Sequence, residues 1–280
     1  MNPATINLIN QPLLVMEAAS LRLGRRHFGP YTLTLHAGER VAVLGPSGAG
    51  KSTLLKLAAR ELHHSGGHIS LLGRDIRHYS LREMSRRRAV LAQTTHVAFG
   101  MQTELVVSLG RAALEIDPHL TTIVHSAMQL AHAAHLAGRK MDQLSGGEQA
   151  RIHLARIFAQ LWDIEQGLVM MDEPLAALDP GLQGELLDSM QSYAEARGHA
   201  LLAILHDINQ ALHAFDRLLL VNNGQLEKQV NADLHALPAL QSLYGIQLSS
   251  LMTPDGQALV YRQKNPSLSP RAQTHNRLNS

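Results

Sequence analysis

Residues 41–53 read VAVLGPSGAGKST and decide the fold class of this 280-residue chain. The segment starts with an apolar run at 41–44, passes through a glycine-rich turn and enters a helical pattern at 52–60. Gly45 to Ser52 fit the spacing G-x-x-x-x-G-K-[ST], in which glycines let the backbone curl and point several N–H groups at one anion. A strand, this turn and a helix in succession predict a phosphate-binding loop at a helix N-terminus, where the helix dipole attracts negative charge.

The side chains of this loop favour a nucleoside triphosphate as the ligand. Lys51 places a point charge on the β- and γ-phosphates, and Ser52 offers its hydroxyl to Mg²⁺. The residues expected to hold the phosphates are consecutive in the sequence: Gly45, Pro46, Ser47, Gly48, Ala49, Gly50, Lys51, Ser52 and Thr53.

A second apolar run, 168–171, ends at two adjacent carboxylates, Asp172 and Glu173. Ligands of open α/β sheets gather at the carboxyl ends of the strands, so this pair is expected beside the glycine-rich loop. Asp172 then suits Mg²⁺, directly or through water, and Glu173 suits removal of a proton from an attacking water. A solvated pair of turn acids is the alternative from this segment alone.

Further apolar runs at 200–205 and 218–221 alternate with segments of helical spacing at 152–162 and 182–193. Asn223-Gly224 predicts a tight hairpin into residues 225–230. Continuous apolar strands indicate a sheet covered on both faces, so we expect an α/β architecture with a mostly parallel core. Residues of about 95–165 are mainly helical in pattern and predict a helical subdomain inserted in that core.

Composition limits the classes of function. The chain is 45% hydrophobic and 17% charged, with a net charge of +2, which is too small to predict nucleic-acid binding. It has no Cys, which excludes disulfides and Cys-based zinc sites. We find no signal-peptide pattern and no apolar run approaching 18 residues, so we expect no membrane span. We predict a flexible arm at 1–12, a folded domain at 13–262 and a disordered tail at 263–280.

Residues 144–149 read LSGGEQ and resemble the signature of the ABC-transporter ATPases. The resemblance extends over about residues 13–262, and the other family motifs occur in order. Gln93 matches the Q-loop, residues 177–179 (Ala-Leu-Asp) match the D-loop, and His206 after the run 200–205 matches the switch histidine. A soluble ABC ATPase acting on DNA or ribosomes and a small-molecule P-loop kinase are the alternative classes.

The resemblance implies a P-loop NTPase core with a mostly parallel sheet, an inserted helical subdomain and an N-terminal antiparallel β region. It also implies a homodimer in which ATP lies between the phosphate loop of one copy and the signature of the other. The residues implied to bind nucleotide beyond that loop are Gln93, Ser145, Gly146, Gly147 and Asp179. Mg²⁺ is expected on Ser52, Gln93 and Asp172, and the residues expected to act in hydrolysis are Lys51, Glu173 and His206.

One position departs from the family pattern. ABC subunits usually place an aromatic residue, which stacks on adenine, some twenty residues before the phosphate loop. Leu23 stands at about that position, with Phe28 and Tyr31 nearby. The sequence therefore does not identify the residue that contacts the base.

The transported substrate is suggested only by likeness. Residues 155–162, 206–211 and 243–257 look most like the haem-import ATPases, with ferric siderophore and cobalamin importers as alternatives. The resemblance implies a two-subunit membrane permease that docks near residues 94–110, a periplasmic or surface substrate-binding protein that acts indirectly, and a peripheral location on the cytoplasmic face of the inner membrane.

Overall fold

The computed structural model describes residues 11–92, 100–173, 178–254 and 256–263. Its centre is a six-stranded sheet in the order β10-β9-β3-β8-β7-β6. The strands are β3 (Arg40–Leu44), β6 (Arg88–Leu91), β7 (Leu168–Asp172), β8 (Ala200–Ile204), β9 (Arg217–Asn222) and β10 (Gln225–Asn231). All pairs are parallel except β9 with β10, whose antiparallel pairing forms the hairpin expected at Asn223-Gly224. The predicted α/β class is confirmed.

The central sheet is apolar on both faces because successive strand side chains point to opposite sides. In β3, Ala42 and Leu44 belong to the core on one face, and Val41 and Val43 belong to the core on the other. All four side chains are fully enclosed. This is why the strand reads as a continuous apolar run rather than as an alternation of apolar and polar residues.

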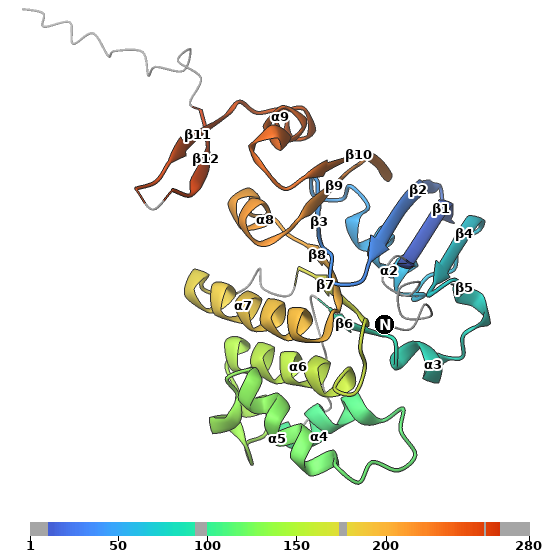
Figure 1. Ribbon diagram of the computed structural model, residues 1–280, viewed down its shortest axis with the longest axis vertical. Helices are drawn as coiled ribbons and strands as arrows, with labels where there is room; N and C mark the ends of the chain where they lie inside the picture. Colours follow the sequence, from blue (N-terminus) through green and yellow to red (C-terminus); the bar gives the residue numbers. More distant parts are fainter. Residues whose placement is uncertain (1–10, 93–99, 174–177, 255, 264–280) are drawn as a thin grey trace, which may run out of the picture.

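A separate four-stranded antiparallel sheet is formed by two strands before the phosphate loop in the sequence and two strands after it. Its order is β2-β1-β4-β5, from β1 (Pro12–Leu23), β2 (Arg26–His36), β4 (Gly66–Leu71) and β5 (Arg74–Asp75). Helix α2 (Lys51–Ala58) lies between this sheet and the central one, as Figure 1 shows. β1 begins at Pro12, inside the 1–12 range predicted as an arm, and residues 1–10 lie outside the described chain.

Between β6 and β7 the described chain is helical. After the short α3 (Leu81–Ser85) and β6 come α4 (Thr103–Ser108), α5 (Leu120–Leu130) and α6 (Gly146–Gln160), joined by single turns of 3-10 helix. Figure 1 shows α4, α5 and α6 stacked on the side of the molecule away from α9, with α7 (Pro180–Arg197) next to α6.

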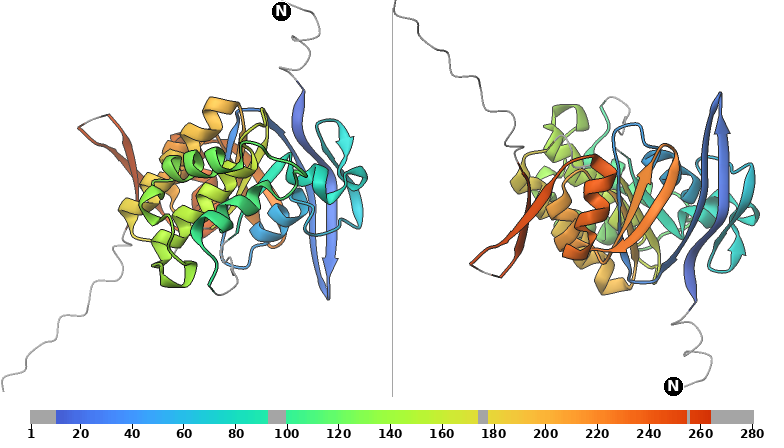
Figure 2. Two further views of the ribbon diagram at one scale, coloured as in Figure 1. Left: turned by 90° about the horizontal axis from the view of Figure 1, so that it is seen from below. Right: turned by 90° about the horizontal axis from the view of Figure 1, so that it is seen from above.

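The chain ends in α8 (Ile208–Ala214), α9 (Leu237–Tyr244) and a two-stranded hairpin of β11 (Leu248–Met252) and β12 (Ala258–Arg262). Figure 2 shows this hairpin projecting on the side opposite the N-terminal sheet. None of the helices in the described ranges combines the length and the apolar character that crossing a membrane requires.

Candidate functional site

The residues of the phosphate loop lie at the C-terminal end of β3. Gly50 is in the left-handed region at φ 102°, and a Cβ there would lie 3.0 Å from the Phe28 ring. A Cβ on Gly45 would lie 2.0 Å from the carbonyl oxygen of Val221, which no backbone adjustment of a few tenths of an ångström relieves. Gly50 is therefore required by its backbone conformation, and Gly45 by the close approach of the Val221 backbone.

Lys51 is buried at the first residue of α2, with 5% of its surface exposed. Its Nζ donates to the carbonyl oxygens of Gly45 at 2.9 Å and Pro46 at 3.2 Å, and lies 3.6 Å from Glu173 Oε1. The ammonium group is thus held inside the loop by oxygen atoms that phosphate oxygens could replace. This placement is the one that its predicted role requires.

Ser52 and Asp172 meet although they are 120 residues apart in sequence. The Ser52 hydroxyl donates to Asp172 Oδ1 at 2.9 Å. Burial raises the pKa of Asp172, while the Ser52 hydrogen bond and the nearby Lys56 and Lys51 act in the opposite direction. Two hard oxygen ligands side by side at a phosphate loop fit the preference of Mg²⁺ for oxygen.

Glu173 and His206 form the closest contact in the site. Glu173 Oε2 lies 2.7 Å from His206 Nε2, and the carboxylate is 14% exposed against 49% for the imidazole. Glu173 has φ 50°, a left-handed conformation that is strained for a residue with a Cβ. In this turn after β7, the carboxylate contacts His206, two residues beyond the end of β8.

Strand order explains why these side chains converge. β8 lies between β3 and β7, and all three run parallel. Lys51, Glu173 and His206 each follow the carboxyl end of one of these strands, so they gather at a single edge of the sheet.

A cavity of about 370 Å³ opens above the loop. Residues 47–53, Glu173 and His206 line it, together with Arg26 and Phe28 from β2. The Arg26 guanidinium lies 5.3 Å from the Phe28 ring centroid and donates to the carbonyl oxygen of Gly48 at 3.1 Å. Leu23, the residue at the expected aromatic position, is 43% exposed and is not part of the lining.

Arg26 is the lining residue that the sequence did not point to, because no motif marks a β2 arginine. Its planar cation beside an aromatic ring offers a surface on which a nucleobase can stack. The wall beside the loop is thus built from Arg26 and Phe28.

The signature residues lie elsewhere in the same chain. Ser145 is the N-cap of α6 and forms a capping box with Glu148: each side chain binds the other's backbone N–H, at 3.3 and 2.8 Å. Neither Ser145 nor Gly146 nor Gly147 lines the cavity at the phosphate loop. The phosphate loop at the start of α2 and the predicted signature residues at the N-terminus of α6 therefore lie at separate places in this chain.

Asp179 also occupies a helix terminus. It caps α7 by accepting from the backbone N–H of Leu182 at 3.0 Å, and its side chain is exposed. Gln93 and residues 174–177 of the D-loop region lie outside the described chain. Of the predicted site residues, Lys51, Ser52, Asp172, Glu173 and His206 come together, and Ser145, Gly146, Gly147 and Asp179 do not join them.

A family model described as ABC transporter matches residues 28–176, more than half of the chain. The chain belongs to the ABC transporter family. It is therefore an ATP-binding and ATP-hydrolysing subunit, which excludes the alternative of a small-molecule P-loop kinase.

The sequences of curated relatives align with most of this ABC ATPase. A protein of Pseudomonas entomophila (strain L48) named hemin import ATP-binding protein HmuV is 42% identical over 245 residues, covering 84% of this chain and 94% of the relative. The protein of the same name from Bordetella pertussis (strain Tohama I) is 38% identical over 259 residues, covering 88% and 99%.

Solved structures support the fold of this ABC ATPase. The ADP conformation of MJ1267, an ATP-binding cassette of an ABC transporter, aligns with a TM-score of 0.71 at 20% identity and covers 84% of this chain and 98% of that one. The cbiO1 protein of Clostridium perfringens, part of an ABC transporter complex, aligns with a TM-score of 0.70 at 20% identity and covers 84% and 92%.

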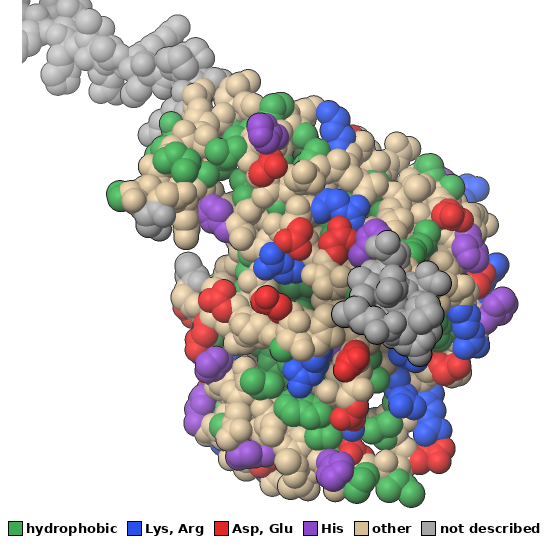
Figure 3. Space-filling view, in the orientation of Figure 1, with side chains coloured by type: hydrophobic (Ala, Val, Ile, Leu, Met, Phe, Trp, Pro, Cys, Tyr) green, Lys and Arg blue, Asp and Glu red, His purple; other side chains and the backbone are tan. Residues whose placement is uncertain are grey.

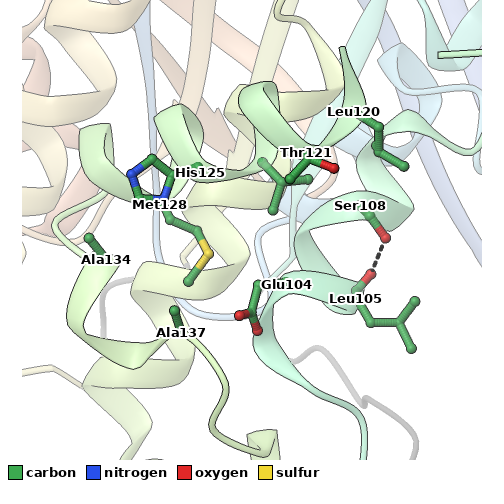
Figure 4. A pocket seen from close by; sticks show the side chains of 10 residues that line it. Glu104, Leu105, Ser108, Leu120, Thr121, His125, Met128, Ala134 and Ala137 are labelled. Carbon is green, nitrogen blue, oxygen red and sulfur yellow. Dashed lines mark hydrogen bonds between the residues drawn. The ribbon is translucent and has the colours of Figure 1, made fainter. Parts of the chain in front are cut away.

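The helical segment of this ABC ATPase carries a second cavity, of about 370 Å³, between α4, α5 and residues 134–137. Figure 4 shows Met128 and His125 of α5 on one side and Glu104 and Leu105 of α4 on the other. Leu105 is 51% exposed, so this part of the surface presents a large apolar side chain to solvent.

Proposed function

We propose that this chain energises the import of hemin, as a homodimer bound to a two-subunit membrane permease. The observation that carries the ATPase role is the convergence of Lys51, Ser52, Asp172, Glu173 and His206 at one edge of the sheet. The hemin assignment is supported by relatives named hemin import ATP-binding proteins at about 40% identity over most of the chain. Ferric siderophore or cobalamin import is the alternative.

In the proposed cycle, the triphosphate of ATP occupies the backbone N–H groups of residues 45–53. Lys51 Nζ exchanges its contacts with the Gly45 and Pro46 carbonyl oxygens for phosphate oxygens. The residues that would hold Mg²⁺ are Ser52 and Asp172, with Gln93 as a third ligand by family likeness. When bound, this ion would neutralise phosphate charge.

Glu173 is the proposed general base, and its carboxylate orients a water and takes its proton. His206 lies within 2.7 Å of that carboxylate and contacts the γ-phosphate in the proposal. Glu173 lines the cavity at the phosphate loop, so its carboxylate can lie within hydrogen-bond distance of a water that attacks the γ-phosphate.

The homodimer rests on the separation of the two half-sites. The phosphate-loop cavity has no lining residue from the signature, while the N-terminus of α6 carries Ser145, Gly146 and Gly147 with the favourable end of a helix dipole. A second copy in a head-to-tail arrangement would bring its signature to the γ-phosphate. ATP would then hold the dimer closed, and hydrolysis would release it.

Dimerisation tests this arrangement directly. With magnesium and saturating ATP, the Glu173→Gln variant is expected to run as a dimer in size-exclusion chromatography with light scattering, and as a monomer without nucleotide. A Ser145→Ala/Gly147→Asp double variant should bind ATP and stay monomeric. A Glu173→Gln protein that remains monomeric at saturating ATP contradicts the shared site.

The permease is proposed to dock on the helical segment and the adjacent core. Of the predicted docking range 94–110, residues 94–99 lie outside the described chain, and 100–110 include α4. Residues of α4 line the cavity of Figure 4, and a cavity of about 600 Å³ lies between α3, α6 and residues 109–115, which follow α4.

Two arginines at the larger cavity each have a side-chain nitrogen without a hydrogen-bond partner within the described chain. The Nε atoms of Arg88 and Arg156 are enclosed and have no hydrogen-bond partner, and burial lowers the pKa of both side chains. An enclosed guanidinium nitrogen without a partner is unfavourable. Both side chains are half-buried and line this cavity, so their other guanidinium nitrogens can be reached from outside. We propose that an acidic group of the permease enters the cavity and pairs with these guanidinium groups, with the chain bound at the cytoplasmic face of the inner membrane.

Copurification with the permease tests that surface. Arg88→Gln is expected to weaken recovery of the complex while the isolated subunit keeps its ATPase activity. Arg74→Gln is the matched control, because that arginine is paired with Glu83. Equal recovery of both complexes would remove Arg88 from the interface.

The substrate is tested by uptake. The chain and the permease encoded alongside it would be reconstituted in proteoliposomes with the cognate binding protein, and ATP-dependent entry of hemin, ferric siderophore and cobalamin would be compared. We expect hemin uptake that disappears in the Glu173→Gln complex. Transport of a siderophore or cobalamin without hemin would replace the substrate and leave the ATPase role intact.

A further inference from the structure

The C-terminal hairpin is attached to the helix that follows the switch histidine. The Asn209 side chain of α8 donates from Nδ2 to the carbonyl oxygen of Val260 at 3.0 Å and accepts the Val260 backbone N–H on Oδ1 at 2.7 Å. One turn along α8, His213 Nε2 lies 2.7 Å from the carbonyl oxygen of Ala258. Side chains of α8 thus bind β12 along its backbone as a neighbouring strand would.

The register of the hairpin makes this attachment possible. Val260 pairs with Ser250 in an antiparallel ladder. In such a ladder, alternate residues direct both backbone groups away from the partner strand. Val260 is one of these residues, because Asn209 takes both its N–H and its carbonyl oxygen. The carboxamide of Asn209 presents a donor and an acceptor side by side and so matches a strand edge.

From their lengths, we expect neither α8 nor the β11–β12 hairpin to be stable on its own. α8 has 7 residues, fewer than an isolated helix needs in water. A two-stranded hairpin is also marginal without packing. The hairpin is covered at Val260, which is 6% exposed, whereas Leu251, Leu259 and Tyr261 on the other face are 41–45% exposed. Figure 3 shows hydrophobic side chains in this region of the surface.

The attachment lies three residues from the catalytic contact. His206 follows β8, and Asp207 caps α8 by accepting from the Gln210 N–H at 2.9 Å. His206 Nε2 in turn lies 2.7 Å from Glu173. A rotation or shift of the first turn of α8 therefore moves His206 relative to Glu173, and Asn209 is in that first turn.

We propose that Asn209 is a positioning residue that fixes α8, and with it His206, against the C-terminal hairpin. The hairpin β11–β12 is then part of the apparatus that sets the rate of hydrolysis, although it contributes no residue to the nucleotide cavity. This inference rests on the roles proposed for Glu173 and His206.

Steady-state ATPase kinetics of the full chain test the positioning role. Asn209→Leu keeps the side-chain volume and removes both hydrogen bonds. We expect kcat to fall about 3- to 30-fold, a range typical of residues that act through a neighbouring element, with KM for ATP changed less than about twofold. Asn209→Asp keeps the acceptor for the Val260 N–H and should recover part of kcat. A variant that loses thermal stability but keeps wild-type kcat shows a merely structural anchor and overturns the proposal.

Val260→Pro perturbs the same contact from the hairpin side. Proline at this position removes the backbone N–H that donates to Asn209 Oδ1. A strand tolerates proline where the missing N–H would point away from the paired strand. If the contact itself sets kcat, the Asn209→Leu/Val260→Pro double variant should lose no more than about the larger single effect. Additive losses would overturn the coupling. This pair also keeps the test valid if Asn209→Leu folds poorly.

Glu173→Gln, measured in parallel, distinguishes a failure of the positioning role of Asn209 from a failure of the proposed catalytic site. Loss of turnover in Glu173→Gln with wild-type turnover in Asn209→Leu and Val260→Pro overturns the positioning role alone. Wild-type turnover in Glu173→Gln overturns the assigned site, and with it the premise of this inference.

Discussion

Replacement of Glu173 by Gln tests the chemical step with a minimal change of shape. The carboxylate lies 2.7 Å from His206 Nε2 and 3.6 Å from Lys51 Nζ, and is 14% exposed. Glutamine has the same size and keeps an oxygen toward His206, but it cannot accept a proton from water. A general base contributes about 10²- to 10⁴-fold, so kcat should fall by that factor, which corresponds to about 3–5 kcal/mol in the barrier.

The affinity of the Glu173→Gln variant for ATP should increase or stay constant, although its kcat falls. Glu173 places a negative charge next to the ammonium group that binds the phosphates, and Gln removes the repulsion between that charge and the γ-phosphate. Phosphate release under single-turnover conditions measures the chemical step, and equilibrium titration with labelled ATP measures affinity. The exposed Glu165→Gln is the matched control for loss of one negative charge.

One outcome would refute the assignment of Glu173 as the general base. A Glu173→Gln protein that binds ATP and hydrolyses it within about threefold of the wild-type rate would show that this carboxylate is not the base. Loss of both binding and turnover would instead indicate that the substitution disturbs the turn after β7, where Glu173 adopts φ 50°.

Three further predictions follow from the described contacts. Lys51→Ala removes a charged donor from the loop and should weaken ATP binding by about 10- to 100-fold in equilibrium titration; unchanged affinity would contradict the P-loop assignment. Tyr193→Phe removes the buried hydrogen bond to the Phe158 carbonyl oxygen at 2.7 Å and should lower the free energy of unfolding by about 1–2 kcal/mol in urea melts, with ATP binding unchanged. Burial lowers the pKa of His199 from 6.5 to about 4, so the unfolded chain binds the proton first on acidification and stability should fall by up to about 3 kcal/mol between pH 6.5 and 4. His199→Gln should reduce the slope of the unfolding free energy against pH in this range, with buried His153 supplying the rest, and the exposed His63→Gln should leave the slope unchanged; equal slopes in the two variants would contradict the assignment.

Much of the site could be predicted because its parts are local. The loop at 45–53 combines a strand end, glycines and a helix start within a few residues, and each is a backbone preference that a short segment expresses by itself. The pattern Ser145-x-x-Glu148 likewise encodes a capping box, which the structure contains. The hairpin at Asn223-Gly224 is equally local.

Other features had no local signal. Arg26 lines the cavity at the phosphate loop only because the start of β2 lies beside that loop. Asn209 contacts β12 only because the chain returns to α8 some fifty residues later. A single side chain carries no mark of a neighbour that is distant in sequence. The sequence shows that Leu23 stands at about the position of the expected aromatic residue. It does not show that Arg26 and Phe28 line the cavity in its place.

The sequence by itself determined the family and predicted a phosphate loop with Lys51 and Ser52. It also predicted that Asp172, Glu173 and His206 lie at or just beyond the ends of strands. Only the tertiary structure decided that these groups meet. The strand order β3-β8-β7 brings Ser52 to Asp172 across 120 residues and Glu173 to His206 within 2.7 Å. Strand order arises from the packing of whole faces of the sheet, a sum over many distant contacts, and so no short motif encodes it.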